Sequence, residues 1–358
     1  MALLGVMSKG WKYLTSQGES RDGPRGQLLT ILQGTWIAQA CYALAKLEIP
    51  DLLADGPRPA ADLAEECGAD PQALHRLLRV LVYLGLLAQP APDTFALTEV
   101  TALMRRDIPG SMHGTALIYG EDVFRCFAEV MHPLLHGRPG FEKVAGKPIY
   151  DYLNDNAEAA RTWNESMSRN RIPEILASCD LTEAKVVVDV GGGTGRLLAQ
   201  LLATHPHLRG VLQELPTAVE QARELFVDAG LADRVDLVAG SFFDTVPEGG
   251  DTYILARCLH NWNDEHALTI LRRVRDAMGP CARLLVLEDL TTDDVSLVDL
   301  VMLVQHEGHD RTEEQYRALL DAAGFQVMRT RRLEGGDPHA EGVIEAVPNT
   351  LAGHWWPA

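Results

Sequence analysis

One histidine stands where it could remove a proton from a bound ligand. His260 follows the predicted strand Thr252–Leu255, and in open α/β sheets ligands bind beyond the carboxyl ends of the strands. Histidine is the side chain best suited to accept a proton near neutral pH, and such general-base help contributes roughly 10²–10⁴-fold to a rate. His260 is therefore the candidate base, whereas the remaining histidines have no comparable position and are interpreted as surface or packing residues.

Two carboxylates could reach this histidine. Glu288 lies at the end of the predicted strand that begins at Arg283, and Asp310 lies in the loop Glu307–Thr312. An adjacent carboxylate fixes the imidazole tautomer and stabilises the imidazolium that forms when a proton is taken up. Two alternatives stay open: Asp310 as the N-cap of a helix over Thr312–Ala323, and Glu288 as a solvated strand end.

A glycine-rich stretch supplies a second candidate site. Val186–Gly195, V-V-V-D-V-G-G-G-T-G, predicts a strand and a tight turn that opens a helix over Arg196–Ala203. Glycine has no Cβ, so this turn can approach a ligand closely, and Asp189 presents a carboxylate there. Glu214 ends the next predicted strand, where an acid can accept hydrogen bonds from both hydroxyls of a ribose. The spacing does not fit the dinucleotide fingerprint. The glycine loop holds no basic residue to specify a phosphate, and it would equally suit an uncharged ribose and an amino-acid group. The alternative is a structural turn without a ligand.

The hydrophobic periodicity of the sequence changes once along the chain. Residues 26–175 have mostly helical periodicity, whereas strand-like runs alternate with amphipathic helices from Lys185 onward. This pattern predicts a doubly wound α/β sheet closed by two further strands. We expect a helical domain over 1–175, a Rossmann-like domain over 176–348 and a tail over 349–358, with the boundary near Ile175–Thr182. The expected strands are Val186–Val190, Gly210–Gln213, Val235–Val238, Thr252–Leu255, Arg283–Leu287, Gln326–Arg331 and Gly342–Ala346.

Within the helical half, residues 57–100 have the pattern of a winged helix. Asp70-Pro71 predicts a capped helix start, Gly85 a helix end, and Thr94–Thr98 part of a hairpin. Such a module can bind DNA. Here acidic residues outnumber the arginines, which disfavours phosphate binding and favours a structural or dimer-forming role. The charged residues counted are Arg58, Arg76 and Arg79 against Asp62, Glu65, Glu66, Asp70, Asp93 and Glu99.

Composition narrows the class of protein. The 358 residues carry a formal net charge of −18, which disfavours nucleic acid and anionic membranes as partners. The cysteines form no C-x-x-C pair, so we expect neither a metal site nor a disulfide framework. The N-terminus lacks the layout of a signal peptide and no long uncharged apolar run occurs, so we expect a cytoplasmic protein.

Taken together, these motifs resemble the S-adenosylmethionine-dependent O-methyltransferases of the plant caffeate and bacterial polyketide type. The resemblance spans residues 28–347 and rests on the order and spacing of the glycine motif and four others. These are Glu214-Leu215-Pro216, Gly240-Ser241-Phe242-Phe243-Asp244, Leu259-His260-Asn261-Trp262, and Asp310-Arg311-Thr312 with Ala323-Gly324-Phe325. It implies an α/β Rossmann-like methyltransferase domain preceded by a helical dimerisation domain, a homodimer, and a small aromatic acceptor.

The resemblance also implies roles for individual residues. Gly191 and Gly193 would line the methionine part of S-adenosylmethionine, Glu214 would bind its ribose, and His260 would be the base flanked by Glu288 and Asp310. The expected cofactor-binding residues are Asp189, Gly191, Gly193, Glu214, Leu215, Gly240, Ser241, Phe242 and Arg257. The expected substrate-binding residues are Trp163, Asn164, Met167, Asn261, Met302 and His306.

Some positions depart from the family pattern. Asn261 stands where the family usually has Asp, Ala256 where it often has Lys, and Glu307-Gly308-His309-Asp310 replaces Gly-Gly-x-Glu. The first hypothesis is therefore O-methylation of a phenolic or polycyclic aromatic metabolite, without a metal. A second keeps the fold and cofactor but hydroxylates, decarboxylates or catalyses a pericyclic step. A third, a ligand-sensing winged-helix regulator, is disfavoured by the acidic balance.

Overall fold

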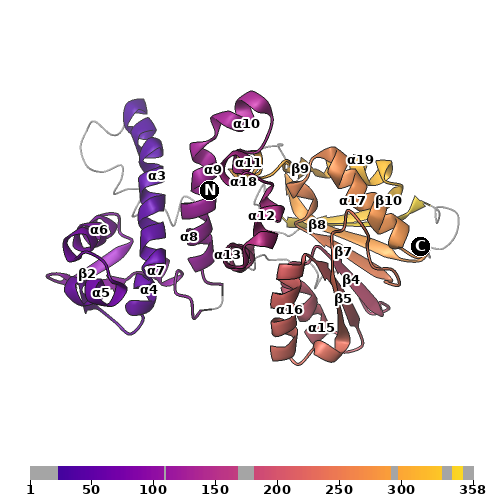
Figure 1. Ribbon diagram of the computed structural model, residues 1–358, viewed down its shortest axis with the longest axis horizontal. Coiled ribbons are helices and arrows are strands. Elements are labelled where there is room, and N and C mark those ends of the chain that lie inside the picture. Colours follow the sequence, from indigo (N-terminus) through magenta and orange to yellow (C-terminus); the bar gives the residue numbers. More distant parts are fainter. Residues whose placement is uncertain (1–22, 109, 168–180, 292–296, 333–340, 350–358) are drawn as a thin grey trace. The chain divides into compact units, whose positions relative to one another are not determined.

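The computed structural model describes residues 23–108, 110–167, 181–291, 297–332 and 341–349 (Figure 1). The chain divides into two compact units: unit 1 holds Met1–Phe124 with Glu165–Met167, and unit 2 holds Arg125–Asn164 with Ser168–Ala358. Residues 125–164 thus group with the sheet. The predicted boundary near Ile175–Thr182 falls largely outside the described residues, as does nearly all of the predicted tail, so the domain limits stay predictions.

Unit 2 is built on a mixed sheet with the strand order β10-β11-β8-β7-β4-β5-β6, and the short β9 pairs with β8. The strands β4 to β8 are parallel, whereas β10 and β11 form an antiparallel pair whose β11 also runs antiparallel to β8. Each expected strand is confirmed, with ends that differ by at most a few residues. The strands are β4 (Val186–Val190), β5 (Arg209–Glu214), β6 (Val235–Ala239), β7 (Thr252–Ala256), β8 (Arg283–Thr291), β9 (Arg311–Thr312), β10 (Phe325–Arg332) and β11 (Glu341–Pro348).

This strand order decides where a ligand can bind. From β4 the chain moves outward to β5 and β6, and then returns to place β7 on the other side of β4. The β4/β7 pair is therefore the point at which the strand order reverses, and the crevice beyond the carboxyl ends at such a point is the usual ligand site. The glycine turn follows β4 and His260 follows β7, so the topology brings both candidate sites to one edge.

Helices cover both faces of the sheet (Figure 1). On one face, α15 (Arg196–Thr204) and α16 (Pro216–Asp228) bury Leu198, Leu202 and Phe226 against the strands. On the other face, α17 (Asp264–Ala277) and α19 (Glu313–Ala322) bury Ile270 and Tyr316. Two short turns complete this part, η2 (Ala232–Arg234) and η3 (Leu259–Asn261).

The remaining helices of unit 2 form a smaller layer with a core of its own. Cys126, Phe141, Ile149, Leu153 and Val304 are buried together in this layer. Its helices are α9 (Phe124–Ala128), α10 (Met131–His136), α11 (Gly140–Ala145), α12 (Ile149–Asp155), α13 (Ala157–Met167) and α18 (Leu297–Gln305). Because α18 immediately precedes the loop that carries Asp310, this core ties the layer to the site.

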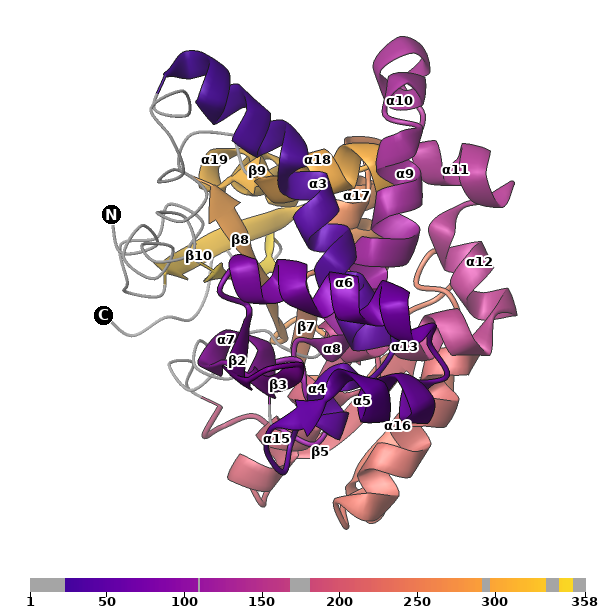
Figure 2. The ribbon, with the colours of Figure 1, turned by 90° about the vertical axis from the view of Figure 1, so that its left-hand side faces the viewer.

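Unit 1 contains the predicted winged helix. Asp70 caps α6 by accepting a hydrogen bond from the backbone N–H of Ala73, and Gly85 adopts the left-handed conformation after the helix. Figure 2 shows α5, α6 and the β2–β3 hairpin grouped together. The elements of the unit are α3 (Pro24–Lys46), α4 (Ile49–Leu52), β1 (Arg58–Pro59), α5 (Ala60–Cys67), α6 (Pro71–Tyr83), β2 (Leu87–Ala91), β3 (Thr94–Leu97), α7 (Glu99–Ala102), α8 (His113–Ile118) and the π-helix η1 (Tyr119–Val123).

The helix α3 leaves much of its apolar surface uncovered. Leu28, Leu29, Ile31, Leu32 and Trp36 are all exposed, with Trp36 at 69%. Among the described residues α3 is the one helix long and apolar enough to cross a membrane. That is weak evidence for a membrane span, since the core helices of soluble proteins and signal sequences can be equally long and apolar. An uncovered apolar helix of this size also fits a protein–protein interface.

Candidate active site

Glu214 at the end of β5 is bonded to the glycine turn. Its Oε2 accepts a hydrogen bond of 3.1 Å from the N–H of Gly193, and its Oε1 accepts one of 2.6 Å from the N–H of Leu215. Each carboxylate oxygen can accept a further hydrogen bond. Gly193 has φ +59°, and nothing lies within 4 Å of the place where its Cβ would stand. The turn therefore faces open space beside Glu214, as a nucleoside site requires.

Asp189 is buried behind the same turn. The residue is 0% exposed, and neither carboxylate oxygen has a hydrogen-bond partner among the described atoms. Burial, and secondly the charge of Glu214, raises the pKa of this carboxyl to about 7. Burial also raises the pKa of Glu214. Two acids held in this way are best satisfied by a cation, and the sulfonium and ammonium groups of S-adenosylmethionine fit that need.

Phe242 closes the turn from the other side. Its ring lies 3.2 Å from the position that a Cβ on Gly191 would take, so this glycine is required both by contact and by its φ of +69°. The Phe242 ring also meets Trp262 edge-on, with centroids 6.0 Å apart. Gly240 donates its N–H to the carbonyl of Glu214, and Ser241 Oγ accepts from the N–H of Phe243. The predicted cofactor residues of β4, β5 and the segment after β6 thus come together.

The guanidinium of Arg257 is paired with acidic side chains. It has φ +49°, and its Nη1 lies 3.0 Å from Asp289 Oδ2 and 3.6 Å from Glu341 Oε1. Its predicted contact with the cofactor stays a prediction, because the structure gives the guanidinium another role.

The turn η3 that carries His260 is held at both ends. Glu288 Oε1 accepts hydrogen bonds from the N–H groups of Cys258 and Leu259, at 3.0 and 2.8 Å. Arg311 is fully buried and donates to the carbonyls of Leu259 and Trp262, at 3.0 and 2.8 Å. The backbone on either side of His260 is therefore bonded to two charged side chains from β8 and β9.

The imidazole of His260 points toward two carboxylates. Its Nδ1 lies 3.5 Å from Glu288 Oε2 and 3.9 Å from Asp310 Oδ1, and all three side chains are buried. Neither distance is a hydrogen bond, but catalytic contacts are often long in a protein without ligands. Burial lowers the pKa of His260 well below its ordinary value, with further contributions from Arg257, His306 and Arg311. The imidazole is thus neutral and can accept a proton.

The structure excludes the two alternative roles considered for Asp310 and Glu288. The N-cap of α19 is Thr312, which forms a capping box with Gln315, so Asp310 as an N-cap was wrong. Glu288 is 1% exposed, so a solvated strand end was wrong as well. Burial raises the pKa of Glu288 to about 7 although Arg257 opposes the shift.

Gly308 explains how the loop reaches the base. A Cβ at this position would lie 2.1 Å from the carbonyl oxygen of His260 and 2.4 Å from the nitrogen of Trp262. Only glycine lets the loop pack on the turn so closely. The N–H of Asp310 donates to Asp299 Oδ1 at 3.0 Å, which ties the loop back to α18. The neighbouring Glu307 pairs with His266 on α17, so its carboxylate is engaged there.

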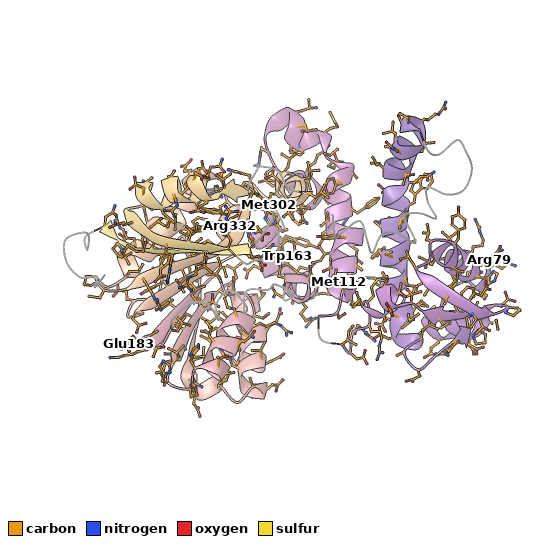
Figure 3. All side chains as sticks on the ribbon, turned by 180° about the vertical axis from the view of Figure 1, so that it is seen from behind. Arg79, Met112, Trp163, Glu183, Met302 and Arg332 are labelled. Atoms are coloured by element: carbon orange, nitrogen blue, oxygen red, sulfur yellow. The ribbon has the colours of Figure 1, made fainter. Side chains whose placement is uncertain are left out.

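Aromatic rings form a wall next to the base. Tyr150 on α12 stacks on Trp262 with centroids 5.3 Å apart, and His306 lies 5.8 Å from Tyr150 and 5.7 Å from Trp163. Figure 3 shows Trp163 and Met302 beyond the strand ends, on the side of the short helices. This wall can take a flat aromatic ligand.

The predicted substrate residues do not all reach this wall. Trp163 and His306 are in contact, and Met302 is buried on α18. Asn261 hydrogen-bonds the carbonyl of Arg257, and Asn164 donates to Gln221 on α16 at 3.1 Å. Met167 belongs to unit 1 and is exposed. The structure brings Trp163, Asn261 and His306 to one place, and contact with the substrate stays a prediction for all six residues.

Sequence reasoning missed three residues of this site. Tyr150 and Gly308 were assigned no role, and Arg311 was quoted only within a motif. The sequence signal for Arg311 was its position next to Asp310. The neighbouring sequence does not predict that its guanidinium is buried against Leu259 and Trp262, about fifty residues earlier. Among the described residues no group of three or more His, Cys, Asp or Glu could hold a metal ion.

Comparison with known families decides the class of the protein. The O-methyltransferase domain family matches residues 127–326, and the O-methyltransferase dimerisation domain matches residues 29–107. The chain belongs to the O-methyltransferase family. It is an S-adenosylmethionine-dependent methyltransferase, in agreement with the two acids, Asp189 and Glu214, beside the glycine turn.

Two relatives show the range of the family. The chain is 35% identical to phenazine O-methyltransferase PhzM of Lysobacter antibioticus, over 90% of this chain and 95% of that one. It is 36% identical to 8-amino-8-demethylriboflavin N,N-dimethyltransferase of Streptomyces davaonensis, over 82% and 87% of the two chains. The family therefore includes transfer to oxygen and to nitrogen.

Solved structures agree with this assignment. The methyltransferase matches the mitomycin 7-O-methyltransferase MmcR with a TM-score of 0.86 and 34% identity, over 92% of this chain and 99% of that one. It matches an O-methyltransferase from neocarzinostatin biosynthesis with a TM-score of 0.78 and 30% identity, over 87% and 96%. That protein was crystallised with S-adenosylmethionine and 2-hydroxy-5-methyl naphthoic acid.

Proposed function

We propose that this methyltransferase transfers a methyl group to a hydroxyl of an aromatic secondary metabolite, with His260 as the general base. The observation that carries the proposal is the buried, neutral imidazole of His260 between two buried carboxylates, on a turn fixed by Glu288 and Arg311. The relatives act on phenazine and mitomycin compounds, which supports a ring-bearing acceptor.

Bound S-adenosylmethionine supplies an electrophilic methyl group on a positively charged sulfur. Glu214 would accept hydrogen bonds from the ribose hydroxyls, and the carboxylate of Asp189 would balance the positive charge. The main task of the protein is then to hold the acceptor oxygen in line, about 3 Å from that methyl group. His260 takes the hydroxyl proton, and Glu288 and Asp310 stabilise the imidazolium without taking the proton themselves.

We expect His260→Ala to slow methylation by roughly two to four orders of magnitude at neutral pH while affinity for S-adenosylhomocysteine is kept. The defect should shrink at higher pH, because a phenol with a pKa near 10 ionises without help. Glu288→Gln and Asp310→Asn should each give a smaller loss. His205→Ala is the matched control, since His205 ends α15 at the opposite edge of the sheet.

The measurement is the initial rate with S-adenosylmethionine and a panel of aromatic polyketides, read as a mass gain of one methylene. A His260→Ala rate within about threefold of the parent across the pH range would count against the base. Proximity alone would then suffice, or the fold would serve the alternative of hydroxylation, decarboxylation or a pericyclic step.

We propose in addition that the protein is a cytoplasmic homodimer. The dimerisation domain and the uncovered apolar face of α3 support the dimer. The acidic net charge supports the expectation that neither nucleic acid nor an anionic membrane is its partner.

A further inference from the structure

Two polar side chains stand in the aromatic wall, and one of them has a ring nitrogen without a partner among the described atoms. His306 is 4% exposed, lies against the rings of Tyr150 and Trp163, and has no hydrogen-bond partner for its Nδ1 among the described atoms. Buried polar groups are normally paired, so an unpaired one among these rings indicates a ligand. The second group is the hydroxyl of Tyr150.

The Tyr150 hydroxyl lies beside the side-chain amide of Asn261, which hydrogen-bonds it. The amide nitrogen of Asn261 also donates to the carbonyl of Arg257, 3.3 Å away. A phenol hydroxyl can donate one hydrogen bond and accept others, so that of Tyr150 can donate to a ligand while it accepts from this amide.

Both groups lie near the proposed base. Tyr150 stacks on Trp262, two residues after His260, and His306 contacts the rings of Tyr150 and Trp163. His306 also contributes to the lowered pKa of His260. An acceptor whose hydroxyl meets His260 would then have its ring against this wall and its neighbouring substituents near Tyr150 and His306.

The charges around this place disfavour an anion. Asp189, Glu214, Glu288 and Asp310 are all acidic and border the site. The charges of the nearby guanidiniums are already paired: Arg257 lies against Asp289 and Glu341, although its Nε has no hydrogen-bond partner among the described atoms, and Arg311 binds Asp264 and backbone carbonyls. A carboxylate on the acceptor would be buried without an opposite charge from these residues, which is costly.

We propose that Tyr150 and His306 together bind a neutral carbonyl oxygen of the acceptor, so that the substrate is a hydroxyaryl ketone or quinone rather than a hydroxyaryl carboxylic acid. The proposal rests on the proposed function, because it assigns the acceptor of the same site. Burial lowers the pKa of His306 to about 3, so the imidazole that meets the carbonyl is neutral and donates through one ring nitrogen.

The test compares three ligands with one ring system on protein saturated with S-adenosylhomocysteine: 1-hydroxy-2-acetonaphthone, 1-naphthol and 1-hydroxy-2-naphthoate. Dissociation constants are measured by calorimetry. We expect the ketone to bind about tenfold more tightly than naphthol, since two neutral hydrogen bonds are gained, and more tightly than the carboxylate. Tyr150→Phe should reduce the preference for the ketone about three- to tenfold. His306→Leu should do the same, and His306→Gln, which keeps a donor, should retain part of it.

The matched control is Tyr152→Phe on the same helix. Tyr152 meets Phe141 edge-on and its hydroxyl accepts from Asn156, so its loss should leave the preference for the ketone unchanged. Unchanged affinity for S-adenosylhomocysteine shows that each variant is folded. The proposal is overturned if the ketone binds no better than naphthol, if the carboxylate binds best, or if the variants keep the full preference. The readout needs no methyl transfer, so a failure of His260 catalysis would be seen separately.

Discussion

The buried carboxyl of Asp189 makes cofactor affinity depend on pH in a way that can be calculated. Its pKa is about 7, against 3.8 for an ordinary aspartate, so the group is neutral in acid and charged only above neutrality. A raised pKa of this kind destabilises the ligand-free protein as pH rises from about 4 to 7. A positively charged ligand that needs the carboxylate has the opposite dependence: its affinity is complete above pH 7 and is lost as pH falls.

At pH 5 about one Asp189 in a hundred is charged, so S-adenosylmethionine, whose sulfonium is positively charged, should bind up to about 100-fold more weakly at pH 5 than at pH 8 in the absence of an acceptor. That factor corresponds to about 3 kcal/mol. In Asp189→Asn this contribution is absent, so affinity at pH 8 should be reduced and the profile should be flatter. Asp236→Asn, an exposed aspartate on β6, should behave like the parent.

Titration calorimetry at each pH, in two buffers with different heats of ionisation, measures both the affinity and the protons released on binding. The parent should release close to one proton from Asp189 per ligand at pH 5 to 6. A parent affinity that is level between pH 5 and 8, or an Asp189→Asn slope as steep as that of the parent, would refute the reasoning.

Three further results are expected. Glu214→Ala should weaken S-adenosylhomocysteine binding by about 1.5–3 kcal/mol, the range for lost hydrogen bonds to a charged group, and unchanged affinity by calorimetry would contradict the ribose assignment. Gly308→Ala should lower kcat at least about tenfold with cofactor affinity kept, because the added Cβ would meet the backbone of His260 and Trp262 and a misplacement of about 1 Å can cost 10²-fold. Gly279→Ala, where a Cβ meets nothing within 4 Å, is its control, and equal kcat in the two would contradict the role of Gly308. Trp36→Glu on α3 should shift sedimentation toward the monomer at micromolar concentration, while an unshifted dimer would place the interface elsewhere.

The strands and the winged helix could be predicted because local patterns specify them. The valines of β4 are buried as a continuous run, and Asp70 caps α6 as its position before proline indicated. Glu214 and His260 followed from the rule that ligands lie beyond the strand ends. Tyr150 could not be found in this way, because its role depends on stacking against Trp262 and a hydrogen bond from Asn261, more than a hundred residues later.

The position of Asp310 also needed the structure. A carboxylate before a helix fits an N-cap by sequence alone, and only the capping box of Thr312 with Gln315 excludes that role. Similarly, the side-chain amide of Asn164 donates to Gln221, a contact between distant segments that the local sequence does not indicate. Local sequence restricts a side chain to an element and a position, whereas the direction of that side chain is decided by packing between elements.

The hydrogen bonds that hold η3 in place have a consequence for how this enzyme could acquire new acceptors. Glu288 from β8 and Arg311 from β9 hold the turn that carries His260, whereas Tyr150 and Trp163 belong to α12 and α13 and His306 follows α18. The proposed base and the residues that position it thus lie on other elements than Tyr150, Trp163 and His306, the residues proposed to contact the acceptor. Natural drift or a designed library could replace these three residues one at a time without moving the proposed base. A fixed catalytic part with an exchangeable recognition part lets one scaffold serve many metabolites.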